Sequence, residues 1–244
     1  MSDFDRNYTA ARGFGADRAA AIDQGLRAHM IRVYNYMAAG VALTGVIAFL
    51  VAQYALSDPA FAQALYASPL AYVVMLAPLG LVFFLSFRIG HMQASTARLL
   101  FFVYAALLGL SLSVIFIAYT QASITRVFFV TAASFGALSL WGYTTQRSLD
   151  AMGSFLIMGL FGIIIASLVN IFLKSTGLDW IISVLGVLIF AGLTAWDTQK
   201  IKEMYDPMDD GTIVGRKAVM GALALYLDFI NMFLFLLRLF GDRR

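Results

Sequence analysis

The chain has 244 residues, of which 61% are hydrophobic and 13% are charged, and its formal net charge is +3. Soluble domains contain about 25% charged residues, so this composition predicts an integral membrane protein. The sequence has no cysteine and only two histidines, which excludes disulfides and thiolate metal sites and argues against a multi-histidine metal site.

Residues 1–30 are predicted to form a polar, mobile arm, followed by one membrane domain over residues 31–241. Aspartate and arginine are interspersed in the arm, and Gly13 and Gly15 disfavour a long helix there. The arm contains no apolar core, so it is not expected to be a cleaved signal peptide. The first apolar segment is therefore expected to direct insertion itself, and a compact chain without a leader suggests a bacterial inner membrane.

Seven long apolar segments follow the arm, and short polar loops separate them. Twenty apolar residues in a helix, at about 1.5 Å per residue, cross a hydrocarbon core of about 30 Å. Strands of an outer-membrane barrel would instead alternate in polarity over about ten residues. The predicted fold class is therefore all-α, a polytopic membrane protein with seven transmembrane helices at about 33–56, 70–88, 99–120, 124–143, 153–173, 179–199 and 217–239.

The distribution of basic residues predicts a cytoplasmic N-terminus, because cytoplasmic loops are enriched in arginine and lysine. The arm and the even-numbered loops carry most of them, whereas the odd-numbered loops contain only Arg126 and Lys174. Seven spans place the C-terminus outside, although it ends in Arg243 and Arg244. A re-entrant last helix is the alternative; we favour seven spans because 217–239 is long enough to cross. The bases do not cluster, so nucleic acid is not an expected partner.

The last apolar segment, residues 218–237, contains Asp228 as its only charge. This position lies near the bilayer centre, where an isolated carboxylate costs about 2.5–3.5 kcal/mol or more. Asp228 therefore needs a partner, a proton or a path to water. Small residues such as Gly221, Ala222 and Ala224 would let neighbouring helices approach closely, which predicts that this helix is central in the bundle.

Asp197 is the other acid embedded in apolar sequence, and it lies at the C-terminal end of the sixth segment. The last helix starts from that same side of the membrane, so a tilted or unwound helix could bring Asp197 to Asp228. The pattern also permits simpler interpretations, in which the two aspartates have only structural roles. Asp197 could pair with Lys200 at i+3 or be solvated, and Asp228 could accept a hydrogen bond from Tyr226 or a neighbouring hydroxyl.

Two carboxylates in a low dielectric cannot both ionise cheaply, so such a pair is expected to share a proton. With the proton the pair can hold two helices together; without it the carboxylates repel, or a cation enters between them. Ca²⁺ prefers about six to eight oxygen ligands, more than two carboxylates supply. Asn231, Thr194 and Thr198 are candidate additional ligands of a weak Ca²⁺ site at Asp197 and Asp228. A proton relay would use the same residues.

Two motifs carry a resemblance to a known family: Trp196-Asp-Thr-Gln-Lys200, and Tyr226-Leu-Asp-Phe-Ile-Asn231 within the last segment. Together with the helix over 159–172, they resemble the Bax inhibitor-1 family, also called the transmembrane Bax inhibitor motif family. The resemblance covers roughly residues 30–241. The chain departs from the family pattern at Trp196, where tyrosine is common, and at Ser148-Leu-Asp150, where the order of the polar residues is reversed.

The resemblance implies a seven-helix fold in which the last helix is enclosed by the other six. It also implies that Asp197 and Asp228 form a pH-sensitive latch on a calcium leak. Arg88, at the end of the second predicted helix, would be the ionic partner in the open form. The alternative for Arg88 is that it only anchors its helix at the membrane surface. The expected partners are the lipid bilayer, Ca²⁺ and H⁺, with no resident cofactor.

The family name and bacterial relatives also imply a second function, in which the chain modulates another membrane protein, such as a protease or a cell-death or stress factor. The arm and the charged loop over residues 200–217 would then be the docking surfaces. An enzyme is not expected. The sequence contains no GxGxxG, P-loop, HExxH or GxSxG motif, and it places no Ser/His pair or metal-ligand set for intramembrane proteolysis.

Overall fold

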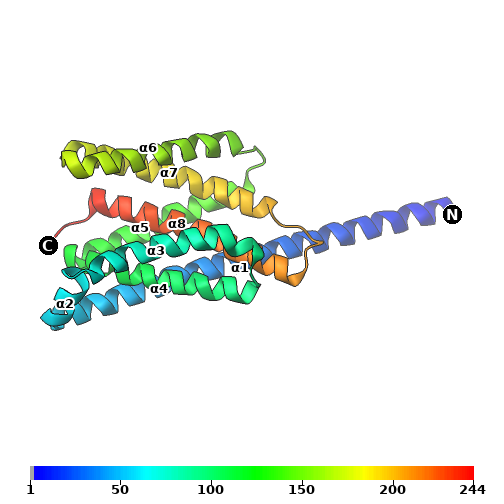
Figure 1. Ribbon diagram of the computed structural model, residues 1–244. Coiled ribbons are helices and arrows are strands. Elements are labelled where there is room, and N and C mark those ends of the chain that lie inside the picture. The colour runs from blue at the N-terminus through cyan, green and yellow to red at the C-terminus, as the bar shows by residue number, and fades with distance from the viewer. Residues whose placement is uncertain (1–2) are drawn as a thin grey trace.

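The computed structural model describes the backbone of residues 3–244 and the side chains of residues 22–244. Over this part of the chain the protein is a bundle of α-helices with no strand, which confirms the all-α class (Figure 1). The helices run side by side along one axis, and the N-terminal part of α1 extends beyond the bundle (Figure 1). The elements are α1 Asp3–Ser57, α2 Pro59–Tyr66, α3 Leu70–Arg88, the 3₁₀ turn η1 Ile89–His91, α4 Ala94–Ala118, α5 Gln121–Thr144, α6 Asp150–Leu173, α7 Thr176–Glu203 and α8 Gly211–Phe240.

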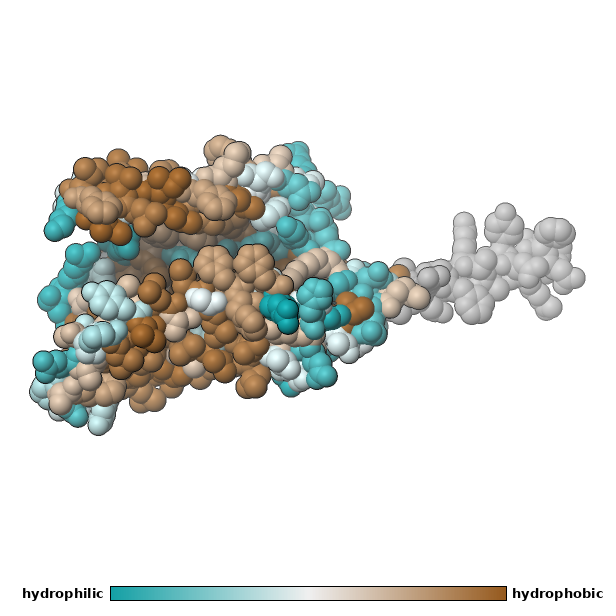
Figure 2. All heavy atoms as spheres, in the orientation of Figure 1, coloured by the Kyte–Doolittle hydropathy of each residue, from teal (hydrophilic) through white to brown (hydrophobic). Residues whose placement is uncertain are grey.

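Seven of the described helices are long and apolar enough to cross a membrane, as predicted. Figure 2 shows hydrophobic side chains over the middle of the bundle and hydrophilic side chains gathered towards its two ends. Large apolar residues such as Phe87 and Phe172 are exposed on the outer surface, where lipid would cover them. This belt identifies the bundle axis as the direction that crosses the bilayer.

Helix α1 is longer than expected, because it begins at Asp3 and continues through Gly13 and Gly15 to Ser57. The prediction that these glycines disfavour a long helix is therefore wrong. Each glycine costs a helix only about 1 kcal/mol relative to alanine, and alanines are frequent on both sides of the pair. The helix crosses residue 30 without interruption, so the division into arm and membrane domain stays a prediction.

The short helix α2 was not predicted. The Asp58 carboxylate accepts hydrogen bonds from the backbone N–H groups of Ala60 at 2.9 Å and Phe61 at 3.2 Å, and Pro59 occupies the first helical position. Aspartate at the N-cap followed by proline is a standard helix start. The Asp58-Pro59 dipeptide was therefore the signal in the sequence that could have predicted this helix.

Helix α8 is the core of the bundle. In its most apolar stretch 61% of the residues are buried within the protein, compared with 6% in α6. It packs mainly against α1, α4, α5 and α7, whereas α3 packs on α4 and α6 packs on α7 at the periphery. The predicted central position is confirmed, with four helices rather than six in close contact. Because α8 is one continuous helix from Gly211 to Phe240, the alternative of a re-entrant last helix is wrong.

The C-terminal tail is held against the turn between α4 and α5. The Ser123 hydroxyl donates to the Asp242 carboxylate at 2.8 Å, and the Asp242 carbonyl accepts from the Thr120 N–H at 3.0 Å. The Arg244 N–H also donates to the Ala118 carbonyl at 3.0 Å. The two chain ends therefore lie at opposite ends of the bundle, as an odd number of spans requires (Figure 1).

Candidate functional site

Asp197 and Asp228 lie together in the interior of the bundle. Asp228 on α8 is 3% exposed, and its Oδ2 atom has no hydrogen-bond partner among the described residues. The half-buried Asp197 on α7 lies beside Asp228, and both side chains line the same cavity. Both helices remain continuous at this point, so no unwinding is needed to bring the two side chains together.

Glycines allow α7 and α8 to approach each other on either side of the aspartate pair. A Cβ atom added at Gly221 would lie 3.0 Å from the Ile201 side chain, and one at Gly186 would lie 2.6 Å from the Phe235 ring. Larger residues at these two positions would push the helices apart. The small residues therefore set the spacing at which two carboxyl groups from different helices can share one proton.

A cavity of about 610 Å³ opens beside the pair, between α6, α7 and α8. The α6 wall is mostly apolar and includes Ile164 and Leu168, with Ser167 as its one hydroxyl residue. Asp197 and Asp228 line the cavity from α7 and α8. Asp228 therefore brings a carboxyl group to a largely apolar cavity, and its buried Oδ2 has no partner among the described residues. An atom of this kind can accept a hydrogen bond from water, share a proton or bind a cation.

Asn231 lines the same cavity, whereas Thr194 and Thr198 are not among the residues that line it. The Asn231 side-chain nitrogen donates to the Leu227 carbonyl at 2.8 Å, which leaves its side-chain oxygen for a ligand. The Thr194 and Thr198 hydroxyls each donate to a carbonyl of α7 at 2.7 Å. Of the three neighbours predicted to help coordinate a cation, the structure therefore brings only Asn231 to the pair.

The described residues contain no group of three or more His, Cys, Asp or Glu side chains that could hold a metal ion. The site offers two carboxyls and one amide oxygen, fewer than the about six to eight oxygens that Ca²⁺ prefers. Water would have to complete its coordination.

The structure does not bring Arg88 to the aspartates. Arg88 is exposed at the end of α3, a helix that packs on α4 at the edge of the bundle. Among the described residues it forms no ion pair, since the two that occur are Lys217 with Asp209 and Arg238 with Asp179. An ionic contact with Asp228 would require α3 to move inward.

The other residues of the α7 motif attach this helix to its neighbours. Gln199 accepts from the Leu149 N–H at 2.7 Å and donates to the Arg147 carbonyl at 2.9 Å, which holds the loop between α5 and α6. The Trp196 indole N–H donates to the Asp150 carboxylate at 3.2 Å at the start of α6. These contacts fix the end of α7 that carries Asp197, and the sequence analysis did not predict them.

Two of the simpler pairings, Asp197 with Lys200 and Asp228 with Tyr226, do not match the contacts. The Lys200 ammonium lies 4.4 Å from the centre of the Trp196 ring and forms no ion pair with Asp197 among the described residues. The Tyr226 hydroxyl lies 2.6 Å from the Thr44 hydroxyl on α1, so it is not the donor to Asp228.

Successive residues of the α8 motif face different helices, as expected for a central helix. Tyr226 packs edge-on against Phe101 and Tyr104 of α4. Two positions later Asp228 faces α7, and Phe229 packs edge-on against Phe135 of α5.

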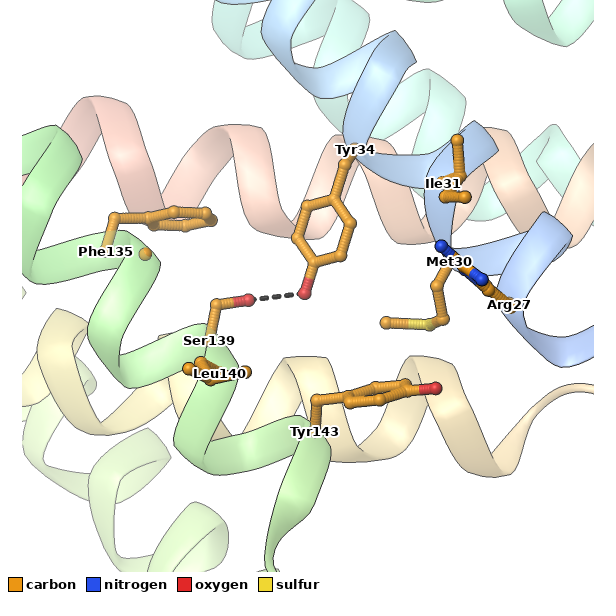
Figure 3. Close-up of a pocket in the computed structure, with 9 residues that line it drawn as sticks. Arg27, Met30, Ile31, Tyr34, Phe135, Ser139, Leu140 and Tyr143 are labelled. Atoms are coloured by element: carbon orange, nitrogen blue, oxygen red, sulfur yellow. Dashed lines mark hydrogen bonds between the residues drawn. The ribbon is translucent and has the colours of Figure 1, made fainter. Parts of the chain in front are cut away.

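A second cavity, of about 480 Å³, lies between α1 and α5. Figure 3 shows Tyr34 reaching from α1 towards Ser139 on α5, with their hydroxyl oxygens 2.5 Å apart. The Ser139 hydroxyl is in turn 2.9 Å from the Thr198 hydroxyl on α7. This chain of hydroxyls ends one residue from Asp197, and it was not predicted because its members lie on three separate segments.

The fold and this site define a polytopic all-α membrane protein with an aspartate pair buried between its last two helices. The family model described as inhibitor of apoptosis-promoting Bax1 matches residues 26–244. The chain belongs to the Bax inhibitor-1 family.

Bacterial relatives are similar over almost their whole length. The inner membrane protein YbhL of Escherichia coli K12 is 47% identical over 223 residues, which cover 90% of this chain and 94% of YbhL. Protein RP147 of Rickettsia prowazekii is 47% identical over 222 residues, covering 91% and 92% of the two chains. Protein YrjE of Lactococcus lactis is 40% identical over 218 residues, which cover 89% of this chain and 92% of YrjE.

Proposed function

We propose that the protein is a pH-sensitive cation leak, with Ca²⁺ as the candidate ion, gated by Asp197 and Asp228. The observation that carries this proposal is the almost fully buried Asp228, which lies against a second carboxyl beside a cavity and whose Oδ2 has no partner among the described residues. A carboxylate is costly in this environment unless it holds a proton or a cation. The site is therefore suited to exchange one for the other.

In the proposed mechanism the shared proton acts as the latch between α7 and α8. One protonated and one ionised carboxyl form a strong hydrogen bond, which holds the two helices together. As pH rises and the proton leaves, two negative charges repel in a low dielectric. The helices then separate or a cation enters, assisted by the Asn231 oxygen and water. We therefore propose that flux increases with pH.

The proposed location is a bacterial inner membrane with the N-terminus in the cytoplasm. The relative YbhL is named as an inner membrane protein, and the basic residues of this chain favour that orientation. For Arg88 we propose a role only in an open form, because in the described form it is exposed and remote from the pair. We propose no enzymatic activity; peptide cleavage that disappears in Asp228→Ala would contradict this.

The test is Ca²⁺ flux into liposomes that contain the purified protein, measured between about pH 6 and 8. Asp228→Asn and Asp197→Asn keep the shape of the side chain and its capacity for a hydrogen bond, but they remove the exchangeable proton. Both variants should therefore give low flux that no longer responds to pH. The matched control is Asp179→Asn on the same helix as Asp197, because Asp179 lies near the surface and pairs with Arg238. Wild-type flux that is flat with pH and unchanged in both site variants would refute the proposal.

A second candidate function is modulation of another membrane protein, such as a protease or a cell-death or stress factor. The observation that favours it is the N-terminal part of α1, which extends beyond the bundle (Figure 1). Deleting residues 1–21 should then abolish the effect of the protein on its partner in cells and leave Ca²⁺ flux in liposomes intact. If the deletion changes neither, this second candidate fails.

A further inference from the structure

At the end of the bundle that carries η1 and the loop between α7 and α8, a cavity of about 380 Å³ lies between α1, α4 and α8. Its charged lining residues are Arg32 of α1 and Arg98 of α4, and Ser95 and Tyr36 add hydroxyl groups. None of the lining residues is acidic. Two guanidinium groups from different helices therefore face one space, where no carboxylate of the lining neutralises them.

The described side chains provide no partner for these groups. Neither arginine is in an ion pair there, and Asp209 on the nearby loop is already paired with Lys217. A third guanidinium, that of Arg216, points to the η1 turn and donates to the Gly90 carbonyl at 2.5 Å. The charge of Arg32 and Arg98 is therefore available to an external anion.

The start of α4 adds donors to the same cavity. Gln93, the N-cap residue, makes no side-chain capping bond, and the first backbone bond of the helix runs from the Ala97 N–H to the Gln93 carbonyl. The N–H groups of residues 94–96 consequently remain free for a ligand. The partial positive charge of a helix N-terminus favours an anion at this place, in addition to the two arginines.

The close packing of α8 on α4 bounds this space on one side. Gly215 lies so close to α4 that a Cβ atom there would be 2.6 Å from the Ala94 Cβ. Beyond Arg98, the exposed Leu99 and Val103 continue along α4 towards the middle of the membrane, with 64% and 41% of their surfaces exposed. An anion in the cavity would thus lie at the depth of lipid headgroups, directly above an apolar surface for acyl chains.

We infer that this cavity binds the phosphate of an anionic phospholipid, whose acyl chains lie along α4. Arginine is suited to this role because its planar guanidinium binds phosphate through two parallel hydrogen bonds. The lining presents donors and no acidic acceptor, which selects an anionic group. The inference goes beyond the proposed leak and does not involve the aspartate pair.

The test is native mass spectrometry of the detergent-purified full chain with phosphatidylglycerol, with phosphatidylcholine and with inorganic phosphate alone. Each arginine near a membrane surface contributes about 1 kcal/mol to anionic lipid binding, so Arg32→Gln or Arg98→Gln should weaken phosphatidylglycerol binding about fivefold, and the double variant about 25-fold. Arg32→Lys keeps the charge and should give a smaller loss. Thermal unfolding in the same detergent checks that each variant is folded.

Arg147→Gln is the matched control, because Arg147 is also exposed at this end of the bundle but does not line the cavity. It should bind phosphatidylglycerol like the wild type, as should Asp228→Asn. An equal loss in Arg147→Gln, or full binding in the double variant, would overturn the inference. Inorganic phosphate that binds with the same arginine dependence and displaces the lipid would also overturn it, because the site would then serve a soluble anion.

Discussion

The Tyr34 and Ser139 hydroxyls form a hydrogen bond of 2.5 Å between α1 and α5, although the residues are 105 positions apart in the chain. Its direction follows from the single proton of each hydroxyl. Thr198 donates to the Thr194 carbonyl, so it must accept from Ser139, and Ser139 must then accept from Tyr34. The series of donors therefore runs from Tyr34 at the cavity of Figure 3 through Ser139 and Thr198 to the Thr194 carbonyl on α7.

Replacing Ser139, the middle residue of this hydroxyl series, should lower the stability of the bundle and alter gating. Ser139→Ala removes the acceptor of Tyr34 and the donor to Thr198, so we expect a loss of about 1–2 kcal/mol in the free energy of unfolding. The pH midpoint of Ca²⁺ flux should also shift, because Thr198 adjoins Asp197. Ser167→Ala on α6 is the control, since that hydroxyl donates only to the Ile163 carbonyl of its own helix. Chemical denaturation in detergent and the flux assay measure the two effects, and identical behaviour of both variants would contradict the prediction.

A methyl group at Gly153 should disturb the site from outside. A Cβ atom there would clash with the Trp196 ring, which holds the start of α6 against α7 beside Asp197. We expect Gly153→Ala to destabilise the protein by about 1–3 kcal/mol and to change flux. Gly162→Ala on the same helix is the control, because a Cβ atom there meets nothing within 4 Å. A Gly153→Ala protein as stable and as active as the Gly162→Ala protein would show that Trp196 does not support the site.

The hydroxyl of Tyr226 should contribute to stability and not to gating. Thr44 donates its proton to the Ala105 carbonyl at 2.8 Å, so Tyr226 is the donor in the 2.6 Å contact between the two hydroxyls. Tyr226→Phe keeps the ring packing and should cost about 0.5–1.5 kcal/mol of unfolding free energy. The pH response of Ca²⁺ flux should remain that of the wild type. A lost pH response in this variant would mean that the Tyr226 hydroxyl belongs to the gate.

The C-terminal tail should stabilise the fold without affecting transport. Deleting residues 242–244 removes the contacts of Asp242 with Ser123 and Thr120, and we expect a lower melting temperature with a loss of about 1–3 kcal/mol. Flux per folded protein should not change, because the tail lies outside the aspartate cavity. The comparison variant is Arg238→Gln, which removes an exposed ion pair and a cation–π contact with Phe235 and should cost less than about 1 kcal/mol. It separates anchoring of the tail from loss of surface charge.

The elements that the sequence predicted well are those set by a continuous local signal. Long apolar segments located all seven spans, and the small residues before Asp228 indicated a central last helix. The errors lie where the signal is short or weak. Helix α2 depends on one cap at Asp58, and α1 continues through Gly13 and Gly15 because the cost of two glycines is small.

The candidate site divides in the same way. An acid inside an apolar segment is conspicuous because burying it is costly, so Asp228 and Asp197 could be singled out. Their contact could not be predicted, since it depends on how closely α7 and α8 approach and on how each helix is rotated. The same rotation turns Thr194 and Thr198 away from the aspartate cavity and turns Asn231 towards it.

The sequence by itself determined the class of protein, the number of spans and the two acids that need an explanation, because transfer of apolar and charged groups into lipid depends mainly on the residues themselves. Only the tertiary structure decided which groups meet. It joined Asp197 to Asp228, linked Tyr34 through Ser139 to α7, and left Arg88 at the edge of the bundle. These outcomes depend on helix spacing and rotation, which arise from the packing of all the helices together.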